Sequence, residues 1–350
     1  MNRDHLNNQL TLGVDTHLTS HVAVLINNIG QVVDTQEFPV CLIGYEKLFN
    51  WAKSFGNIKQ AGLEGTGTYG AGLCKFLEEK GLKVFEVNRP NRAKRRLRGK
   101  SDPTDAENAA RSVLANESTA IPKSHDGIVE ALRYLVVARK SAVKARTQAI
   151  NQIRALLVSA PEQIRAACYV PSTCQCIAAC KRIQGEDSDV LLSTLAAMLN
   201  LLANRWLSLT EELRVIGKRL TELTKSTACH LLEQFGVGPY VAATLMVTAG
   251  DNPTRLHKES SFAALCGVNP LEASSGKTQR HRLNRGGSRD ANNALWTVAL
   301  IRMRSDSRTR VYAAKRSAEG KSIKEIQRCL KRYIARELYP IMVSDLSKLT

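Results

Sequence analysis

Two aspartates, Asp102 and Asp105, stand three residues apart at the predicted start of a helix. Residues with this spacing share one face of a helix, so the two carboxylates could hold one hard cation together. The same residues also fit plain capping, because Asp is a favoured N-cap, Pro103 suits the first helical position and Asp105 stands where a capping box has its acid. The pair by itself leaves metal binding and capping both open.

A strongly basic run directly precedes this pair. Residues 88–100 contain seven cationic side chains and no acid, namely Arg89, Arg92, Lys94, Arg95, Arg96, Arg98 and Lys100. Side chains of this kind neutralise the phosphates of nucleic acids and bind them without reading their sequence. A metal-competent pair beside such a run favours chemistry on nucleic acid.

The composition points to the same partner. The chain has 350 residues, 43% of them hydrophobic, and 50 Lys plus Arg against 32 Asp plus Glu, for a net charge of +18. This length allows two or three domains with buried cores, and the basic balance favours nucleic acid over a neutral small molecule. No stretch reaches the roughly 18 continuous apolar residues of a membrane span. The nine cysteines form no CxxC pair, so we expect reduced thiols and no zinc site.

Two further acids fall on predicted strands. Asp15 lies among apolar neighbours on the first strand, where Asp is disfavoured and a functional reason is therefore expected. Glu64 ends the fourth strand, directly before a Gly/Thr loop that would let a backbone or phosphate approach closely. We predict an antiparallel three-stranded meander, a fourth strand, a helix, a fifth strand and the helix of the aspartate pair, over residues 10–16, 21–27, 31–38, 59–64, 69–80, 82–87 and 102–115.

Acids at these places in such an order resemble the ribonuclease-H-like fold of RuvC-type nucleases. In that fold, carboxylates converge on two divalent ions, which activate the attacking oxygen and stabilise the leaving one. Asp15, Glu64, Asp102 and Asp105 form a D-E-D-D set in chain order. Four acids at the expected places are more specific than any single pair, so metal binding is favoured over capping.

Two long helices are predicted next, over residues 129–158 and 192–223. Their apolar residues alternate in steps of three and four, which predicts coiled-coil packing but leaves the partner open between an intramolecular hairpin and a second protomer. The first apolar seam contains Arg139 and Arg146, which would suit an RNA backbone. Residues 161–189, with their prolines and cysteines, are predicted to be a linker.

The C-terminal part is mainly helical by its pattern. Residues 231–247 resemble a helix-hairpin-helix, in which backbone N–H groups near Gly236 and Gly238 could grip a phosphate, although an ordinary helical hairpin fits equally well. A loop at residues 269–276 then opens into a second basic zone, in which residues 277–316 contain eleven Lys or Arg and two acids. Loop serines are mostly solvated or capping residues, and no hydrolase pattern surrounds the serines of this loop.

Several motifs together resemble the transposases of the IS one-ten insertion-sequence family, relatives of the pilin-gene invertase. They occur in family order and cover nearly the whole chain. The motifs are GVDTH with Asp15, LEGTGTYG with Glu64, KSDPTDA with Asp102 and Asp105, LLEQFGVGPYVAATL, SSGKTQRHRLNRGGSRDANNALW, and a weaker match in the tail, RCLKRYIARELY, from Arg328 to Tyr339.

The resemblance implies a RuvC-like domain at residues 1–120, a coiled-coil domain at 121–228 and a mainly helical transposase domain at 229–350. It also implies Mg²⁺-dependent DNA strand cleavage and exchange, guided by a non-coding bridge RNA and passing through a covalent phosphoserine. Donor and target DNA would be bound by a homodimer or homotetramer in the cytoplasm of a prokaryote, at the nucleoid when the protein acts.

The residues of the family map onto this chain motif by motif. The four acids would bind Mg²⁺, as two ions. The family's serine directly precedes a glycine, which selects Ser275 as the nucleophile and leaves the adjacent Ser274 as the alternative. The cations that would meet the phosphates are Lys277, Arg280, Arg282, Arg285 and Arg289.

Two other functions are compatible with these residues. A metal-dependent RuvC-like junction endonuclease, or a DNA invertase that needs no guide RNA, would use the four acids and leave Ser275 structural. A basic architectural protein that binds nucleic acid without catalysis is the third possibility, and the presence of all four acids disfavours it.

Overall fold

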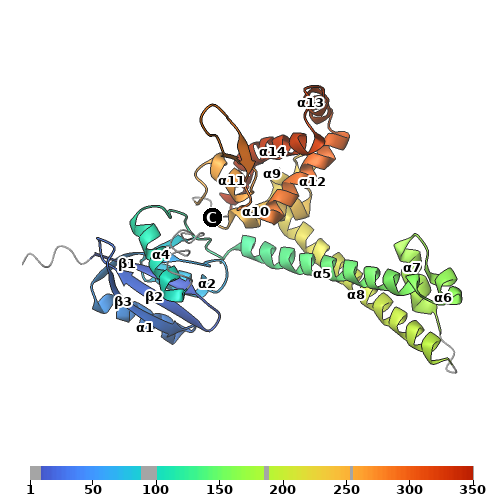
Figure 1. Ribbon diagram of the computed structural model, residues 1–350, viewed down its shortest axis with the longest axis horizontal. Coiled ribbons are helices and arrows are strands. Elements are labelled where there is room, and N and C mark those ends of the chain that lie inside the picture. The colour runs from blue at the N-terminus through green and yellow to red at the C-terminus, as the bar shows by residue number, and fades with distance from the viewer. Residues whose placement is uncertain (1–8, 88–100, 185–188, 253–254, 350) are drawn as a thin grey trace, which may run out of the picture. The chain divides into compact units, whose positions relative to one another are not determined.

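The computed structural model describes residues 9–87, 101–184, 189–252 and 255–349 (Figure 1). The chain divides into two compact units, of which the first holds residues 1–127 and 250–257 and the second holds residues 128–249 and 258–350. The first unit is mixed α/β and the second is mainly helical, as the sequence predicts. The finer division into three domains, with boundaries at residues 120 and 228, stays a prediction.

The first unit is built on one five-stranded sheet with the order β3-β2-β1-β4-β5. The strands β1 (Gln9–Thr16), β2 (Ser20–Ile26) and β3 (Val32–Pro39) form the predicted antiparallel meander. The strands β4 (Asn57–Leu63) and β5 (Lys83–Glu86) continue the sheet in parallel on the other side of β1. β1 is therefore the central strand, and all its residues after the first are buried.

Different helices cover the two faces of this sheet (Figure 1). The helices α1 (Leu42–Ser54), which the sequence pattern did not predict, and α2 (Ala71–Glu79) share an apolar core with Leu12 and the other inward residues on one face. The helix α4 (Asp102–Leu114) packs on the opposite face. Successive side chains of a strand point to opposite faces, so Asp15, at odd spacing from Leu12, belongs to the face that α4 covers.

Two glycines let α4 lie almost directly on the sheet. Gly13 of β1 and Gly62 of β4 are register partners. A Cβ atom on Gly13 would stand 2.5 Å from the Ala110 nitrogen, and one on Gly62 would stand 2.7 Å from the Ala109 carbonyl oxygen. These obstacles are helix backbone, which cannot rotate away as a side chain can. The glycines thus set the depth at which α4 docks, and with it the position of the acids at its start.

We expect Gly13→Ala to lower the free energy of unfolding of the first unit by about 1–3 kcal/mol, the usual cost of an overpacked core. The added methyl group would have to push α4 off β1. Urea unfolding followed by circular dichroism measures the change. Gly67→Ala is the matched control, because its Cβ would meet only His125 Nε2 at an ordinary 3.7 Å. Equal unfolding midpoints for the two variants would contradict the close approach of α4.

The second unit begins with two long helices that pack along each other, α5 (Ile128–Val158) and α8 (Val190–Thr227). Of the two partners that the sequence left open, the intramolecular hairpin is therefore present, whereas pairing with a second protomer stays untested. The predicted linker between them is wrong. That segment forms α6 (Glu162–Cys168) and α7 (Thr173–Arg182), which share an apolar core with the adjoining ends of α5 and α8 (Figure 1). Burial raises the pKa of the thiol of Cys180 in this core, which keeps the thiol protonated.

The arginines in the seam of α5 cover aromatic rings. The guanidinium of Arg139 lies 4.2 Å from the centroid of the Tyr240 ring, and that of Arg146 lies 5.6 Å from the centroid of Trp206. Such contacts stabilise by cation–π attraction and pack the apolar stems of the arginines. Both side chains therefore already have partners within the unit, which weakens the prediction that they meet an RNA backbone.

One helix among the described residues, α8, is long and apolar enough to span a membrane by length and mean hydropathy. The sequence pattern did not predict this. The indication is weak, because long core helices of proteins outside membranes meet the same test. The packing of α8 along α5, α7 and α10 (Pro239–Ala249) gives its apolar seam a partner within the unit.

The rest of the second unit combines helices with one short hairpin. The predicted pair of helices around Gly236 is present, but the first of them, α9, has only four residues. The remaining elements are α9 (Cys229–Leu232), α11 (Glu259–Leu265), β6 (Pro270–Glu272), β7 (His281–Leu283), α12 (Arg289–Ser305), α13 (Ser307–Ala318) and α14 (Ile323–Leu346).

Candidate active site

The backbones of Asp15 and Glu64 lie side by side at the C-terminal ends of β1 and β4, along the edge of the sheet that these strand ends form. Their strands run parallel, and Val14 pairs with Leu63 in register. The Glu64 N–H donates to the Val14 carbonyl oxygen at 3.1 Å, and the Thr16 hydroxyl donates to the Glu64 carbonyl oxygen at 2.8 Å. The C-terminal edge of parallel strands is where α/β folds place their functional side chains.

The aspartate pair reaches the same edge from α4. Asp102 is the first residue of the helix, and Asp102 and Asp105 both lie in its first turn. Their charges act on Asp15, since both raise its pKa. Three of the four predicted acids therefore converge, and the backbone of Glu64 stands at the same edge.

A histidine that the sequence pattern did not single out joins these acids. The Nε2 atom of His17 lies 3.3 Å from Oδ2 of Asp15 and 3.3 Å from Oδ2 of Asp102. The ligand atoms of the three residues all lie within 4.8 Å of one another. The GVDTH motif could have indicated this histidine, because Asp15 and His17 are two residues apart at the end of a strand and residues at that spacing share a face.

The site carries excess negative charge. Burial is the main cause that raises the pKa of Asp15, and the charges of Asp105 and Asp102 raise it further, while His17 lowers it. A carboxylate that is buried beside two like charges favours a bound cation. Carboxylate oxygens with one imidazole suit a hard divalent ion such as Mg²⁺ or Mn²⁺. The side chains present thus fit a divalent metal.

The capping interpretation of the aspartate pair is wrong in its details. The N-cap is Ser101, which makes no side-chain capping hydrogen bond, and Asp102 occupies the first helical position with Pro103 after it. The carboxylate of Asp102 contacts His17 instead. Both acids still gain from the positive end of the helix dipole.

The basic run before α4 lies outside the described residues. This applies to every predicted nucleic-acid contact in it, namely Arg89, Arg92, Lys94, Arg95, Arg96, Arg98 and Lys100.

Ser275 stands at the tip of the β6–β7 hairpin in the second unit, whereas the four acids belong to the first unit. The backbones of Ser275 and Thr278 exchange two hydrogen bonds of 3.1 Å, which close a turn around Gly276 at a φ of +56°. Ser275 is exposed, whereas the hydroxyl of the half-buried Ser274 accepts the Arg280 N–H at 3.3 Å. The hydroxyl of Ser275 is thus the more accessible of the two.

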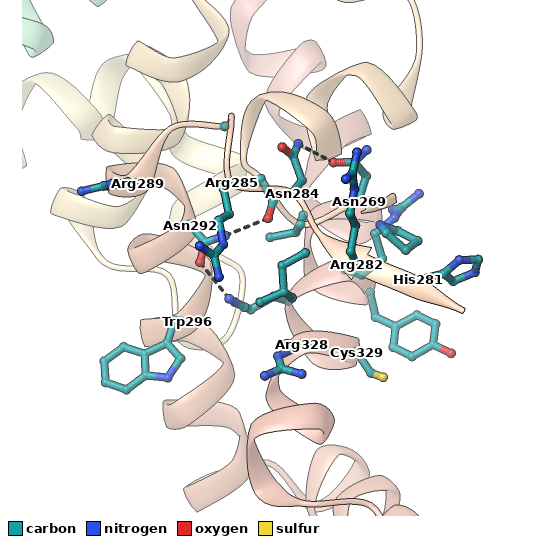
Figure 2. A pocket seen from close by; sticks show the side chains of 18 of the residues that line it. Asn269, His281, Arg282, Asn284, Arg285, Arg289, Asn292, Trp296, Arg328 and Cys329 are labelled. Carbon is teal, nitrogen blue, oxygen red and sulfur yellow. Dashed lines mark hydrogen bonds between the residues drawn. The ribbon is translucent and has the colours of Figure 1, made fainter. Parts of the chain in front are cut away.

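Three of the predicted phosphate-binding arginines line a cavity of ≈ 1220 Å³ in the second unit (Figure 2). These are Arg282, Arg285 and Arg289, from β7, the loop after it and the start of α12. Lys277 and Arg280 are exposed on the hairpin beyond the cavity.

The two glycines of the predicted phosphate grip differ in their surroundings. A Cβ atom on Gly236 would contact Val298 and Ile301 of α12 at 3.4–3.5 Å, whereas one on Gly238 would meet nothing within 4 Å. Gly236, at a φ of +84°, therefore serves the packing of the turn on α12. Gly238 has open space beside it, as a contact with phosphate would need.

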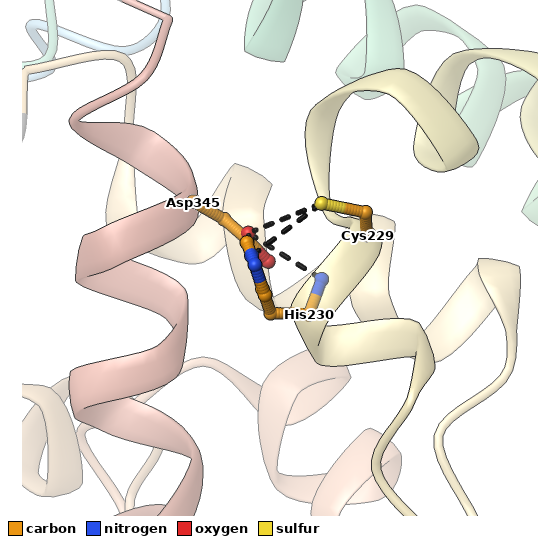
Figure 3. Close-up of side chains that lie close together, drawn as sticks. All are labelled: Cys229, His230 and Asp345. Atoms are coloured by element: carbon orange, nitrogen blue, oxygen red, sulfur yellow. Dashed lines mark hydrogen bonds and ion pairs between the residues drawn. The ribbon is translucent and has the colours of Figure 1, made fainter.

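A second cluster of potential metal ligands joins Cys229, His230 and Asp345 (Figure 3). The buried Asp345 carboxylate of α14 accepts the Leu231 N–H at 3.0 Å and lies 2.5 Å from Nδ1 of His230. The Cys229 thiol donates to the same carboxylate at 3.8 Å. The carboxylate thus satisfies the free N–H groups at the start of α9 and ties that helix to α14. We interpret this cluster as structural.

Two family models match the chain. Residues 12–160 match a model for the DEDD domain of IS110 elements, described as transposase, and residues 229–314 match the model of the Transposase IS116/IS110/IS902 family. The first match includes the four acids and His17, and the second includes the β6–β7 hairpin with Ser275. No curated protein matches the chain.

Proposed function

Because this chain belongs to the IS110 family of transposases and therefore acts on DNA, we propose that it is an RNA-guided, Mg²⁺-dependent recombinase that moves its own element. Its covalent intermediate would be a phosphoserine at Ser275. The observation that carries the proposal is the convergence of Asp15, His17 and Asp102 at the sheet edge of a domain that matches the transposase model.

The sheet supports a ribonuclease-H-like, RuvC-like assignment for the first unit. Its central strand β1 pairs antiparallel with β2 and parallel with β4, and the meander leads into parallel strands connected by helices. That order brings an acid on the first strand next to an acid at the end of the fourth. This neighbourhood of two of the four acids supports the D-E-D-D set.

The acids of the first unit would hold the metal. Asp15 and Asp102 both contact His17. Asp105, whose charge raises the pKa of Asp15, and Glu64, whose backbone lies beside Val14, would complete the set. When bound, Mg²⁺ supplies positive charge that activates the attacking oxygen and stabilises the leaving oxygen of a phosphodiester. The Nε2 atom of His17, 3.3 Å from a carboxylate oxygen of Asp15 and of Asp102, would join them as a nitrogen ligand of the metal.

Ser275 would perform the covalent step. Its Oγ loses a proton to a base and forms a bond to a DNA phosphorus, while a sugar oxygen leaves that phosphorus and takes up a proton. One phosphodiester replaces another, so the bond energy is retained and the strands can be rejoined without ATP. Arg280 and Arg282, which follow the turn on the same hairpin, would meet the negative charge of the transition state.

We expect the purified protein to carry a structured non-coding RNA, and ribonuclease treatment to abolish strand exchange between donor and target DNA. A protein with a net charge of +18 binds a polyanion tightly, and guide pairing would supply the sequence reading that phosphate contacts lack. Adding back the extracted RNA should restore exchange. Full activity on naked DNA after ribonuclease would favour a guide-independent invertase or junction endonuclease. Light scattering of the same sample would test the proposed homodimer or homotetramer.

A further inference from the structure

The cavity of the second unit is strongly cationic. It lies between the β6–β7 hairpin, the start of α12 and one face of α14 (Figure 2). Its lining includes seven Lys or Arg side chains and no Asp or Glu, the cations being Arg282, Arg285, Arg289, Arg328, Lys331, Arg332 and Arg336. Four of these come from α14, within the tail motif that neither the acids nor Ser275 explains.

The arginines of α14 form a row on one face of the helix. Arg328, Arg332 and Arg336 are spaced by four residues, so each stands one turn above the last. Like charges at this spacing destabilise a helix. A bound polyanion would remove that repulsion, and its phosphates would follow the row.

Most of these cations have no internal partner. Arg332 pairs with Glu259, and Lys331 donates to Asn292 Oδ1 at 2.7 Å. Within the described chain, the remaining guanidinium groups make no hydrogen bond or ion pair, namely those of Arg282, Arg285, Arg289, Arg328 and Arg336. The two partnered cations hold the wall of the cavity, and the unpartnered ones are available to a ligand.

Two exposed aromatic rings stand among the cations. Trp296 of α12 is 39% exposed, and its indole N–H donates to Gln327 Oε1 at 3.3 Å, which fixes the ring beside α14. Tyr333 of α14 is 51% exposed, and its ring makes an edge-on contact with the ring of Tyr312, with 5.7 Å between the two ring centroids. Aromatic faces next to unpaired cations are typical of sites for single-stranded nucleic acid, in which bases stack and phosphates pair. A duplex would offer only its backbone, because its base faces are covered.

We propose that this cavity binds a single-stranded nucleic-acid segment, with phosphates on Arg328 and Arg336 and an unpaired base on Trp296. The inference rests on the proposed function and deepens it. Because β7 belongs both to the cavity wall and to the hairpin that carries Ser275, a strand held here would lie next to the proposed nucleophile. The strand could be DNA or RNA, which share this chemistry.

The test measures oligonucleotide binding and not strand exchange. The full-length protein, freed of RNA and carrying Ser275→Ala, is titrated with fluorescent single-stranded DNA, single-stranded RNA and duplex DNA at several salt concentrations. We expect Trp296→Ala to weaken single-strand binding by about fivefold or more with an unchanged salt slope. The double variant Arg328→Ala, Arg336→Ala should lower the salt slope by about 0.7 for each lost phosphate contact. The double variant Arg304→Ala, Arg310→Ala, which removes two exposed cations that do not line the cavity, is the matched control.

Each outcome decides the proposal. A loss of affinity that is confined to single-stranded oligonucleotides supports it. The nucleic acid, DNA or RNA, whose affinity falls more is the one that the cavity binds. Equal affinities for all variants, or equal losses for duplex and single strand, overturn it. Since no chemistry is measured, a failure of the proposed serine or guide RNA would show in the strand-exchange assays and leave this result independent.

Discussion

Ser275→Ala is expected to abolish the protein–DNA adduct that survives denaturation when the protein is mixed with Mg²⁺, guide RNA and both DNA partners. Alanine has no oxygen to attack the phosphorus, and loss of an enzymatic nucleophile slows the reaction by a factor on the order of 10⁶. The fold should be unaffected, because the exposed Ser275 contributes only backbone hydrogen bonds to Thr278, which alanine retains. A denaturing gel with labelled DNA measures the adduct.

Ser274→Ala is the matched control for this experiment. It removes a hydroxyl next to the proposed nucleophile, and the Arg280 N–H loses an acceptor that water can replace at this exposed turn. We expect the adduct to persist in this variant. Loss of the adduct in Ser274→Ala alone, or recombination by Ser275→Ala, would show that the proposed nucleophile is wrong.

Asp15→Asn is expected to have two opposite effects, on activity and on stability. It should reduce DNA cleavage by at least about two orders of magnitude, the scale of losing one group that stabilises transition-state charge. Without divalent metal it should raise the free energy of unfolding at pH 7. Burial, helped by Asp105 and Asp102, raises the pKa of Asp15 above 3.8 in the folded protein.

The sign follows from proton linkage. A folded-state pKa above the unfolded value means that the folded protein loses stability as the pH rises through that pKa. At pH 7 the carboxylate is charged and the whole penalty is present, so a neutral amide removes it. Urea unfolding between pH 4 and pH 8 should show the gain of the variant over the native protein growing with pH.

Magnesium should then raise the free energy of unfolding of the native protein by more than it raises that of the Asp15→Asn variant, because a ligand stabilises only the state that binds it. Glu79→Gln, which removes an exposed acid at the end of α2, is the control and should change neither property. An Asp15→Asn protein that unfolds more easily without metal, or that cleaves DNA normally, would contradict the metal assignment of this edge.

Local patterns predicted the elements that carry the acids. Asp15 was recognised because a charged residue is unusual in an apolar strand, and that strand proved to be the buried centre of the sheet. The steps of three and four residues likewise predicted α5 and α8. In both cases the buried face belongs to a single element, so the order of apolar and polar residues along that element is enough to predict it.

Short elements escaped prediction because their stability comes from other segments. α6 and α7 have seven and ten residues, too few to be stable as isolated helices, and they form by packing on the ends of the two long helices. The segment itself shows prolines, cysteines and no long apolar repeat, so its local pattern suggested a linker. The N-cap of α4 was misplaced by one residue, because the contact of Asp102 with His17 depends on a strand far away in the sequence.

The sequence by itself determined the kinds of chemistry available: the order of the four acids, the serine before a glycine, and the basic rows. Tertiary structure alone decided which of these side chains meet. Asp102 reaches Asp15 because Gly13 and Gly62 let α4 dock closely on the sheet, and the arginine row of α14 faces β7 because the intervening helices fold back on each other. Both contacts join residues remote in the chain, so they depend on the packing of backbone against backbone and on no local pattern.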